Sequence, residues 1–77
     1  MNINRNVTDL NGLGFSAYEK LRNCGNQEIL TIVFTKGKME LETKTIERVN
    51  VYNDSMNIYH KDDTVKYINL NNITYME

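Results

Sequence analysis

The fold is decided by residues 28–45, EILTIVFTKGKMELETKT. Residues 28–35 form a nearly continuous apolar run, which is typical of a β-strand whose two faces are both covered. Lys36-Gly37 supplies a tight turn. Residues 38–45 then alternate, with apolar side chains on one face of the strand and charged side chains on the other. The segment therefore predicts an antiparallel hairpin.

Further strands are expected on the C-terminal side of this hairpin. Alternating hydrophobicity and turn-forming residues place them at 47–52, 56–60 and 64–70, with turns at 53–55 and 61–63 and a short extension at 73–76. Apolar residues occupy both faces of 64–70. We therefore expect this strand either to be covered on both sides or to carry a bulge near Tyr67.

A short helix is expected before the hairpin, at residues 17–24. Ser16 and Glu19 have the spacing of a capping box, in which each side chain bonds the backbone N–H of the other residue. Gly25 is expected to end the helix in the left-handed conformation. Residues 12–14, Gly-Leu-Gly, are interpreted as a flexible lead into the helix, because a phosphate loop would need a preceding strand and a lysine or third glycine.

Together these elements predict a mainly β domain of the α+β class. The 77 residues match the length of one domain, with an N-terminal arm and short helix in 1–25 and an antiparallel meander of five or six strands in 26–77. A curled sheet or a small barrel is the expected way to bury so many apolar strand faces. The open edges of such a sheet favour association of two chains into a dimer.

Composition excludes several classes of function. Nine basic and ten acidic side chains give a net charge of -1, which excludes a strongly cationic nucleic-acid clamp. The single cysteine, Cys24, forms no intramolecular disulfide, so we expect a packed, inert thiol and a reducing compartment, the cytoplasm. The chain contains no apolar run of about 18 residues, so no membrane-spanning helix is expected. The many Asn, Ile, Lys and Tyr residues have AT-rich codons and indicate a low-GC genome.

The residues offer little catalytic chemistry. His60 is the only histidine, and Asp62 and Asp63 follow it. One interpretation makes His60 a base or a metal ligand, and the other makes it a strand side chain near a turn. The second interpretation is favoured. Asp54, Asp62 and Asp63 also lack the spacing of a calcium loop. We therefore expect no enzyme, no metal and no cofactor.

Tyrosine and arginine suggest a binding patch instead. Arg48, Tyr52, Tyr59 and Lys61 are expected to face outward around the turn at 53–55. Tyrosine and arginine dominate the energetics of protein interfaces. The alternative is that the tyrosines are simply good strand formers.

Two resemblances bear on function. The segment 55–58, Ser-Met-Asn-Ile, resembles the Met-Asn-aliphatic step of Sm-like proteins, and 67–75, YINLNNITY, resembles their last two strands. This resemblance implies a small SH3- or Sm-like barrel, RNA binding and ring assembly. In general style the chain is similar to small β-rich proteins of phages and mobile elements from low-GC Gram-positive bacteria. That similarity implies an inhibitor that docks on a host defence protein, as anti-CRISPR proteins do.

The leading hypothesis from the sequence is accordingly a non-enzymatic protein-binding module that docks on a host protein. An Sm-like RNA-binding oligomer is the alternative. A hydrolase or metal enzyme built on His60 is the third and weakest reading.

Overall fold

The computed structural model describes all 77 residues and contains the predicted hairpin. Strands β2 (Ile29–Phe34) and β3 (Gly37–Glu42) pair in antiparallel register, with Leu30 opposite Leu41. Gly37 has a φ of 158°, a backbone conformation that favours glycine, which explains why this residue follows Lys36 in the turn. The hairpin prediction is confirmed.

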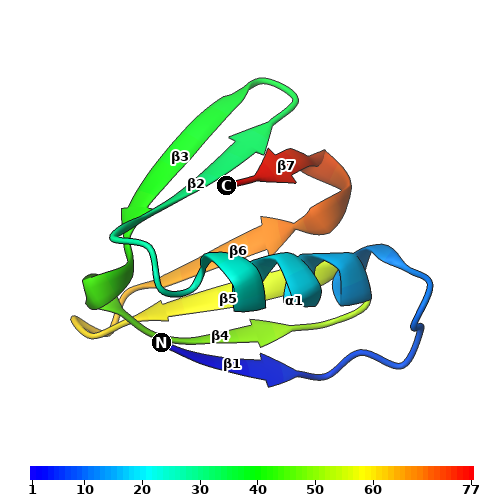
Figure 1. Ribbon diagram of the computed structural model, residues 1–77, viewed down its shortest axis with the longest axis horizontal. Helices are drawn as coiled ribbons and strands as arrows, with labels where there is room; N and C mark the ends of the chain where they lie inside the picture. The colour runs from blue at the N-terminus through cyan, green and yellow to red at the C-terminus, as the bar shows by residue number, and fades with distance from the viewer.

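The hairpin and the other five strands form two open sheets (Figure 1). The predicted single antiparallel meander, curled sheet or closed barrel is therefore wrong. A mixed four-stranded sheet has the order β1-β4-β5-β6, and an antiparallel three-stranded sheet has the order β3-β2-β7. The strands not yet introduced are β1 (Asn2–Arg5), β4 (Ile46–Val51), β5 (Ser55–His60), β6 (Val65–Asn69) and β7 (Ile73–Met76).

Two 3₁₀ turns separate the sheets. The first, η1 (Thr43–Thr45), lies between β3 and β4, and the second, η2 (Leu70–Asn72), lies between β6 and β7. Hydroxyl groups hold η1 in place, because Thr43 donates to the carbonyl of Gln27 and Thr45 donates to the carbonyl of Glu42. The chain turns away at both points instead of continuing as a meander, and β7 returns to pair with β2.

The N-terminal segment predicted as an arm contains a strand. β1 pairs in parallel with β4, with Ile3 opposite Val49. In β1 only Ile3 is apolar, since the strand reads Asn-Ile-Asn-Arg. Four residues with one apolar side chain give almost no periodic signal, and their partner lies more than 40 positions away.

Helix α1 (Leu13–Cys24) begins four residues earlier than predicted. Its N-cap is Gly12, and the Ser16 N–H donates to the Gly12 carbonyl as part of the helix ladder. Ser16 is therefore inside the helix, and the predicted capping box with Glu19 is wrong. Gly25 has a φ of −64°, so the predicted left-handed C-terminus is also wrong.

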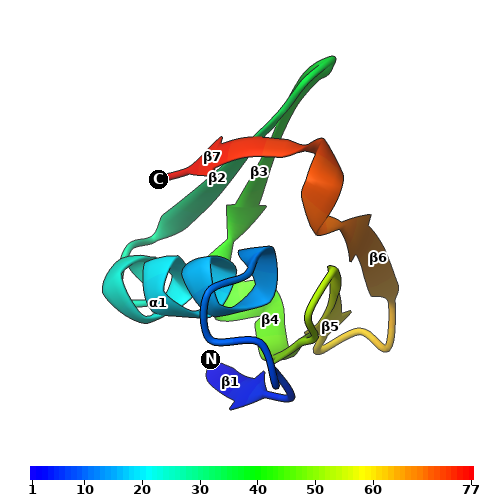
Figure 2. The ribbon, with the colours of Figure 1, turned by 90° about the vertical axis from the view of Figure 1, so that its right-hand side faces the viewer.

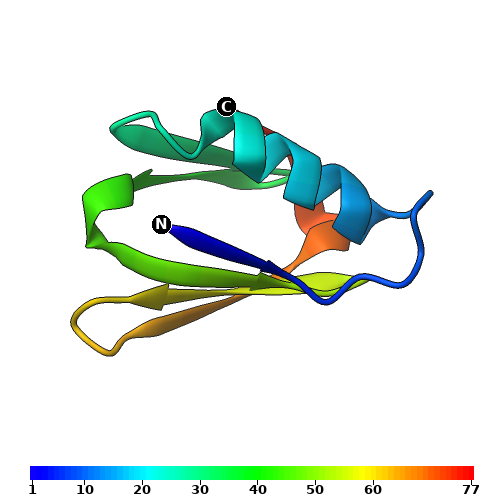
Figure 3. The ribbon, with the colours of Figure 1, turned by 60° about the horizontal axis from the view of Figure 1, so that its bottom comes forward.

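The core lies between the two sheets, and α1 closes their open side (Figures 2 and 3). Leu21 is fully buried there, and Ala17 and Cys24 lie on the same helix face. Cys24 is thus a packed thiol, as predicted. The helix and both sheets share one cluster of 14 buried residues: Ala17, Leu21, Cys24, Leu30, Ile32, Leu41, Ile46, Val49, Val51, Met56, Ile58, Ile68, Leu70 and Met76.

Candidate functional site

The four-stranded sheet has one face on the core and one face that no other element covers (Figure 3). Along each strand the buried side chains alternate with more exposed ones. We call the uncovered side the outer face. The strand register assigns to it the following residues: Asn2, Asn4, Arg48, Asn50, Ser55, Asn57, Tyr59, Val65, Tyr67 and Asn69.

The centre of the outer face is a stack of Arg48 on Tyr59. The guanidinium carbon of Arg48 lies 3.9 Å from the centre of the Tyr59 ring. A cation over the face of an aromatic ring is attracted by the ring quadrupole. Arg48 forms no salt bridge within the chain, so its guanidinium donors are not engaged by a carboxylate.

A β-bulge brings these two side chains together. The register between β4 and β5 shifts from Ile46 opposite His60 to Arg48 opposite Tyr59, which leaves Glu47 as the extra residue. In an unbroken register Glu47 would lie opposite Tyr59. The bulge therefore puts a cation, and not a carboxylate, on the tyrosine ring.

Tyr67 is a second aromatic anchor, and the sequence-based patch did not include it. Tyr67 is 76% exposed and lies opposite Asn57 on the neighbouring strand β5. An open hollow beside Tyr67 is lined by the polar residues Asp54, Ser55, Asn57, Asn69 and Asn71. The face therefore combines aromatic surface with amide donors and acceptors.

The orientation of Tyr67 was available from the sequence. Ile68 and Leu70 are buried, so counting back by twos places Lys66 inward and Tyr67 outward. The β5–β6 register is regular throughout, so the bulge predicted near Tyr67 is absent, and this strand is covered on one face only. The sequence analysis took the apolar residues on the outer side of this strand, Val65 and Tyr67, as a sign of a second covered face or a bulge, whereas they form part of an uncovered surface.

Of the four predicted patch residues, the structure brings together Arg48 and Tyr59 but separates the other two. Tyr52 lies beyond the end of β4, where it is half-buried and its N–H donates to the Ser55 carbonyl. Lys61 follows the opposite end of β5 and is exposed. Six residues of β5 separate them, about 17–20 Å along the strand.

The charge of the outer face is simple. Arg48 is the only charged residue among those that the register assigns to this face, and the carboxylate of Asp54 belongs to a residue that lines the hollow beside Tyr67. The remaining polar groups are amides and hydroxyls, and one pair of amides, Asn4 and Asn50, is joined by a 3.0 Å hydrogen bond. A guanidinium without a carboxylate partner complements an acidic group on the surface of a binding partner.

His60 lies on the other side of the same sheet and is 7% exposed. Lys66 Nζ lies 3.2 Å from its Nε2, and Thr45 Oγ1 lies 3.3 Å from its Nδ1. Because an ammonium group only donates, Nε2 accepts and Nδ1 carries the proton, which it donates to Thr45. His60 is thus a strand residue beside a turn, as predicted, and it acts in a hydrogen-bonded chain that ties β6 to η1.

The aspartates after His60 have a different role. The hydroxyl and the backbone N–H of Thr64 donate to Asp62, at 2.6 and 3.0 Å, and hold the pKa of this carboxyl below its usual range. Asp62 therefore shapes the β5–β6 turn. No three His, Cys, Asp or Glu side chains gather into a group that would hold a metal ion.

No helix in the structure combines the length and apolar character needed to cross a membrane. Comparison of the chain with family models, with curated proteins and with solved structures finds no match.

Proposed function

We propose that this chain is a non-enzymatic protein-binding module that docks through the outer face of its four-stranded sheet. The observation that carries the proposal is the Arg48–Tyr59 stack, with Tyr67 exposed on the next strand. Rigid aromatic groups beside a guanidinium are the residues that most often anchor protein interfaces. Tyr59 is pre-ordered by the stack, so it loses little side-chain entropy on binding.

The charges favour a protein partner over RNA. Tyrosine rings and amide groups on a sheet also suit stacked bases. A bound phosphate backbone, however, needs several lysine or arginine side chains along its path. The outer face provides one cation, Arg48, and the whole chain carries a net charge of -1. RNA binding is therefore the competing outcome in the test below.

The partner proposed first is a protein of a low-GC bacterial host. The composition of the chain and its similarity in style to mobile-element proteins support this choice. Inhibition of a host defence protein by occupation of its surface would require only a rigid docking face.

The test immobilises the full chain, passes a nuclease-treated and an untreated host lysate over it, and identifies stoichiometric partners by mass. Affinity is then measured for the purified partner with Arg48→Ala and Tyr67→Ala variants. Arg22→Ala is the matched control, because Arg22 also lies over a tyrosine ring, Tyr18, but on α1. We expect both outer-face variants to weaken binding at least tenfold and the control to bind normally.

Two results would contradict the proposal. One is recovery of nucleic acid alone, lost on nuclease treatment. The other is a protein partner whose affinity is insensitive to both Arg48→Ala and Tyr67→Ala.

A further inference from the structure

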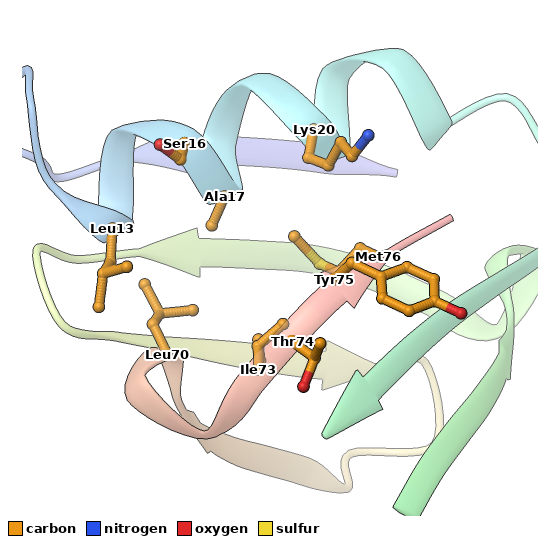
Figure 4. Close-up of a pocket in the computed structure, with 9 residues that line it drawn as sticks. All are labelled: Leu13, Ser16, Ala17, Lys20, Leu70, Ile73, Thr74, Tyr75 and Met76. Atoms are coloured by element: carbon orange, nitrogen blue, oxygen red, sulfur yellow. The ribbon is translucent and has the colours of Figure 1, made fainter. Parts of the chain in front are cut away.

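A groove lies between helix α1 and strand β7, away from the outer face (Figure 4). Its cavity volume is about 340 Å³, which is within the range of small-ligand sites. Its walls are mainly apolar. The helix contributes Leu13, Ala17 and Lys20, among others, and the other side contributes Leu70, Thr74 and Met76.

One wall of this groove is an unpaired sheet edge. Thr31 and Glu77 exchange two backbone hydrogen bonds, at 2.8 and 2.9 Å, so the next residue of β7, Met76, directs its N–H and C=O away from β2. Tyr75 faces its partner Val33, and Thr74 is the extra residue of a bulge, without a partner on β2. The free edge thus presents the N–H and C=O of Met76, and Thr74, two residues away, is not paired with β2.

β7 is also the edge strand with no charged side chain. The other three edges carry charges, namely Arg5 in β1, Lys38, Glu40 and Glu42 in β3, and Lys66 in β6. Charged residues on an edge discourage pairing with another chain. Their absence from Ile-Thr-Tyr-Met leaves β7 open to an added strand.

The groove contains one charge. Lys20 is exposed on α1 and takes part in none of the three salt bridges of the chain. No carboxylate lines the groove. An anionic group on the occupant would therefore meet an unpaired ammonium and no repulsion.

We propose that this groove binds an extended peptide that pairs with the free edge of β7, places apolar side chains against Leu13 and Leu70, and brings a carboxylate to Lys20. A peptide is favoured over a fatty acid because only a peptide backbone satisfies the donors and acceptors of Thr74 and Met76. The site is independent of the outer face, so each of the two proposals stands or fails alone.

The test selects random heptapeptides with free C-termini against the full 77-residue chain. The best peptide is measured by fluorescence anisotropy, beside a twin whose terminus is amidated and whose Asp and Glu are replaced by Asn and Gln. We expect at least tenfold weaker binding for the twin and for Lys20→Glu. Lys36→Glu in the β2–β3 turn is the control, because it makes the same change of charge at a residue that does not line the groove.

A second variant tests the backbone. Thr74→Pro removes the N–H of a residue that has no partner on β2, and proline is tolerated on edge strands and at bulges. We expect it to fold and to bind at least tenfold more weakly. Should the variant fail to fold, hydrogen exchange in the wild type decides the matter, since bound peptide must protect the amides of Thr74 and Met76.

Three results would overturn the proposal. The first is no enriched peptide. The second is binding that protects outer-face amides such as that of Tyr67 and leaves Thr74 unprotected. The third is a doubled mass in light scattering with the Thr74 amide protected before peptide is added, because a second copy would then occupy the edge.

Discussion

Arg48 stacks on Tyr59 at 3.9 Å across two neighbouring strands, and this pair connects the fold of the protein to its proposed function. The contact depends on a bulge at Glu47, which sets the two side chains opposite each other. Other arginine–tyrosine contacts in the chain are longer, for example 5.6 Å between Arg22 and Tyr18. The closest cation–π contact is therefore on the outer face of the four-stranded sheet.

The Arg48–Tyr59 stack is expected to contribute to stability. A double-mutant cycle with Arg48→Ala and Tyr59→Ala is predicted to give a coupling free energy of about 0.5–1 kcal/mol, as for a partly exposed cation–π pair. Urea denaturation of the four proteins measures it. A coupling of zero within error would show that the two side chains do not interact in solution.

Gly14 is expected to tolerate no side chain. A Cβ atom at this position would clash with the Tyr52 carbonyl oxygen and lie 2.9 Å from Asn53 Cα, both of them backbone atoms. Gly14→Ala should lower the free energy of unfolding by about 3 kcal/mol, because the first turn of α1 must move off the β4–β5 turn.

Gly12→Ala is the control for Gly14→Ala. Its nearest contact would be Asp9 Oδ2 at 2.8 Å, the far end of a side chain that can rotate. We expect a loss below about 1 kcal/mol. Equal effects in thermal melts of the two variants would contradict the close approach.

Sequence patterns predicted the hairpin and missed the non-local contacts and both caps of the helix. The β2–β3 hairpin was predictable because its pattern and its turn lie in one continuous segment. The η1 turn was not, because Thr43 makes it by bonding the carbonyl of Gln27, 16 residues away. Gly14 was interpreted as a flexible lead because nothing local reveals that the β4–β5 turn packs on it.

The same distinction applies to the candidate site. Residue type and strand alternation were enough to select Arg48 and Tyr59, but the bulge that joins them is visible only in the pairing of β4 with β5. Tyr52 was included because it flanks the turn at 53–55, and Lys61, in the turn at 61–63, because it is close in sequence to Tyr59. Register places those two turns at opposite ends of β5.

Asp63 is expected to be replaceable by glycine with a gain in stability. Its φ is 71°, and it is the only non-glycine residue of the chain with positive φ. Asp63→Gly should raise the free energy of unfolding by about 0.5–1 kcal/mol, since the left-handed conformation costs glycine nothing. Asp63→Val should lower it. Chemical denaturation of both variants measures the two signs, and a destabilised Asp63→Gly protein would contradict the turn geometry.

Acid should weaken the fold partly through Asp62. Because hydrogen bonds from Thr64 depress its folded-state pKa, its contribution is present above the unfolded-state pKa, which is about 3.9 for aspartate. That contribution is lost as the pH falls through the folded-state value. The stability of Asp62→Asn, followed by urea denaturation between about pH 2 and pH 6, should depend less on pH than that of the wild type. Parallel curves would contradict this.

The tyrosines are expected to separate binding from folding. Tyr67 is 76% exposed, so Tyr67→Ala should change the free energy of unfolding by about 0.5 kcal/mol or less. As an interface anchor it should cost about 2 kcal/mol of binding free energy, on the order of thirtyfold in affinity. Tyr52 is half-buried and lies off the outer face, so Tyr52→Ala should lower the melting temperature and change affinity little. Lys61→Ala should alter neither quantity, because the residue lies beyond the far end of β5. Thermal melts and affinities for the purified partner give all the values. A Tyr67→Ala protein that loses its cooperative melting transition would assign this side chain to the core and remove the second anchor of the outer face.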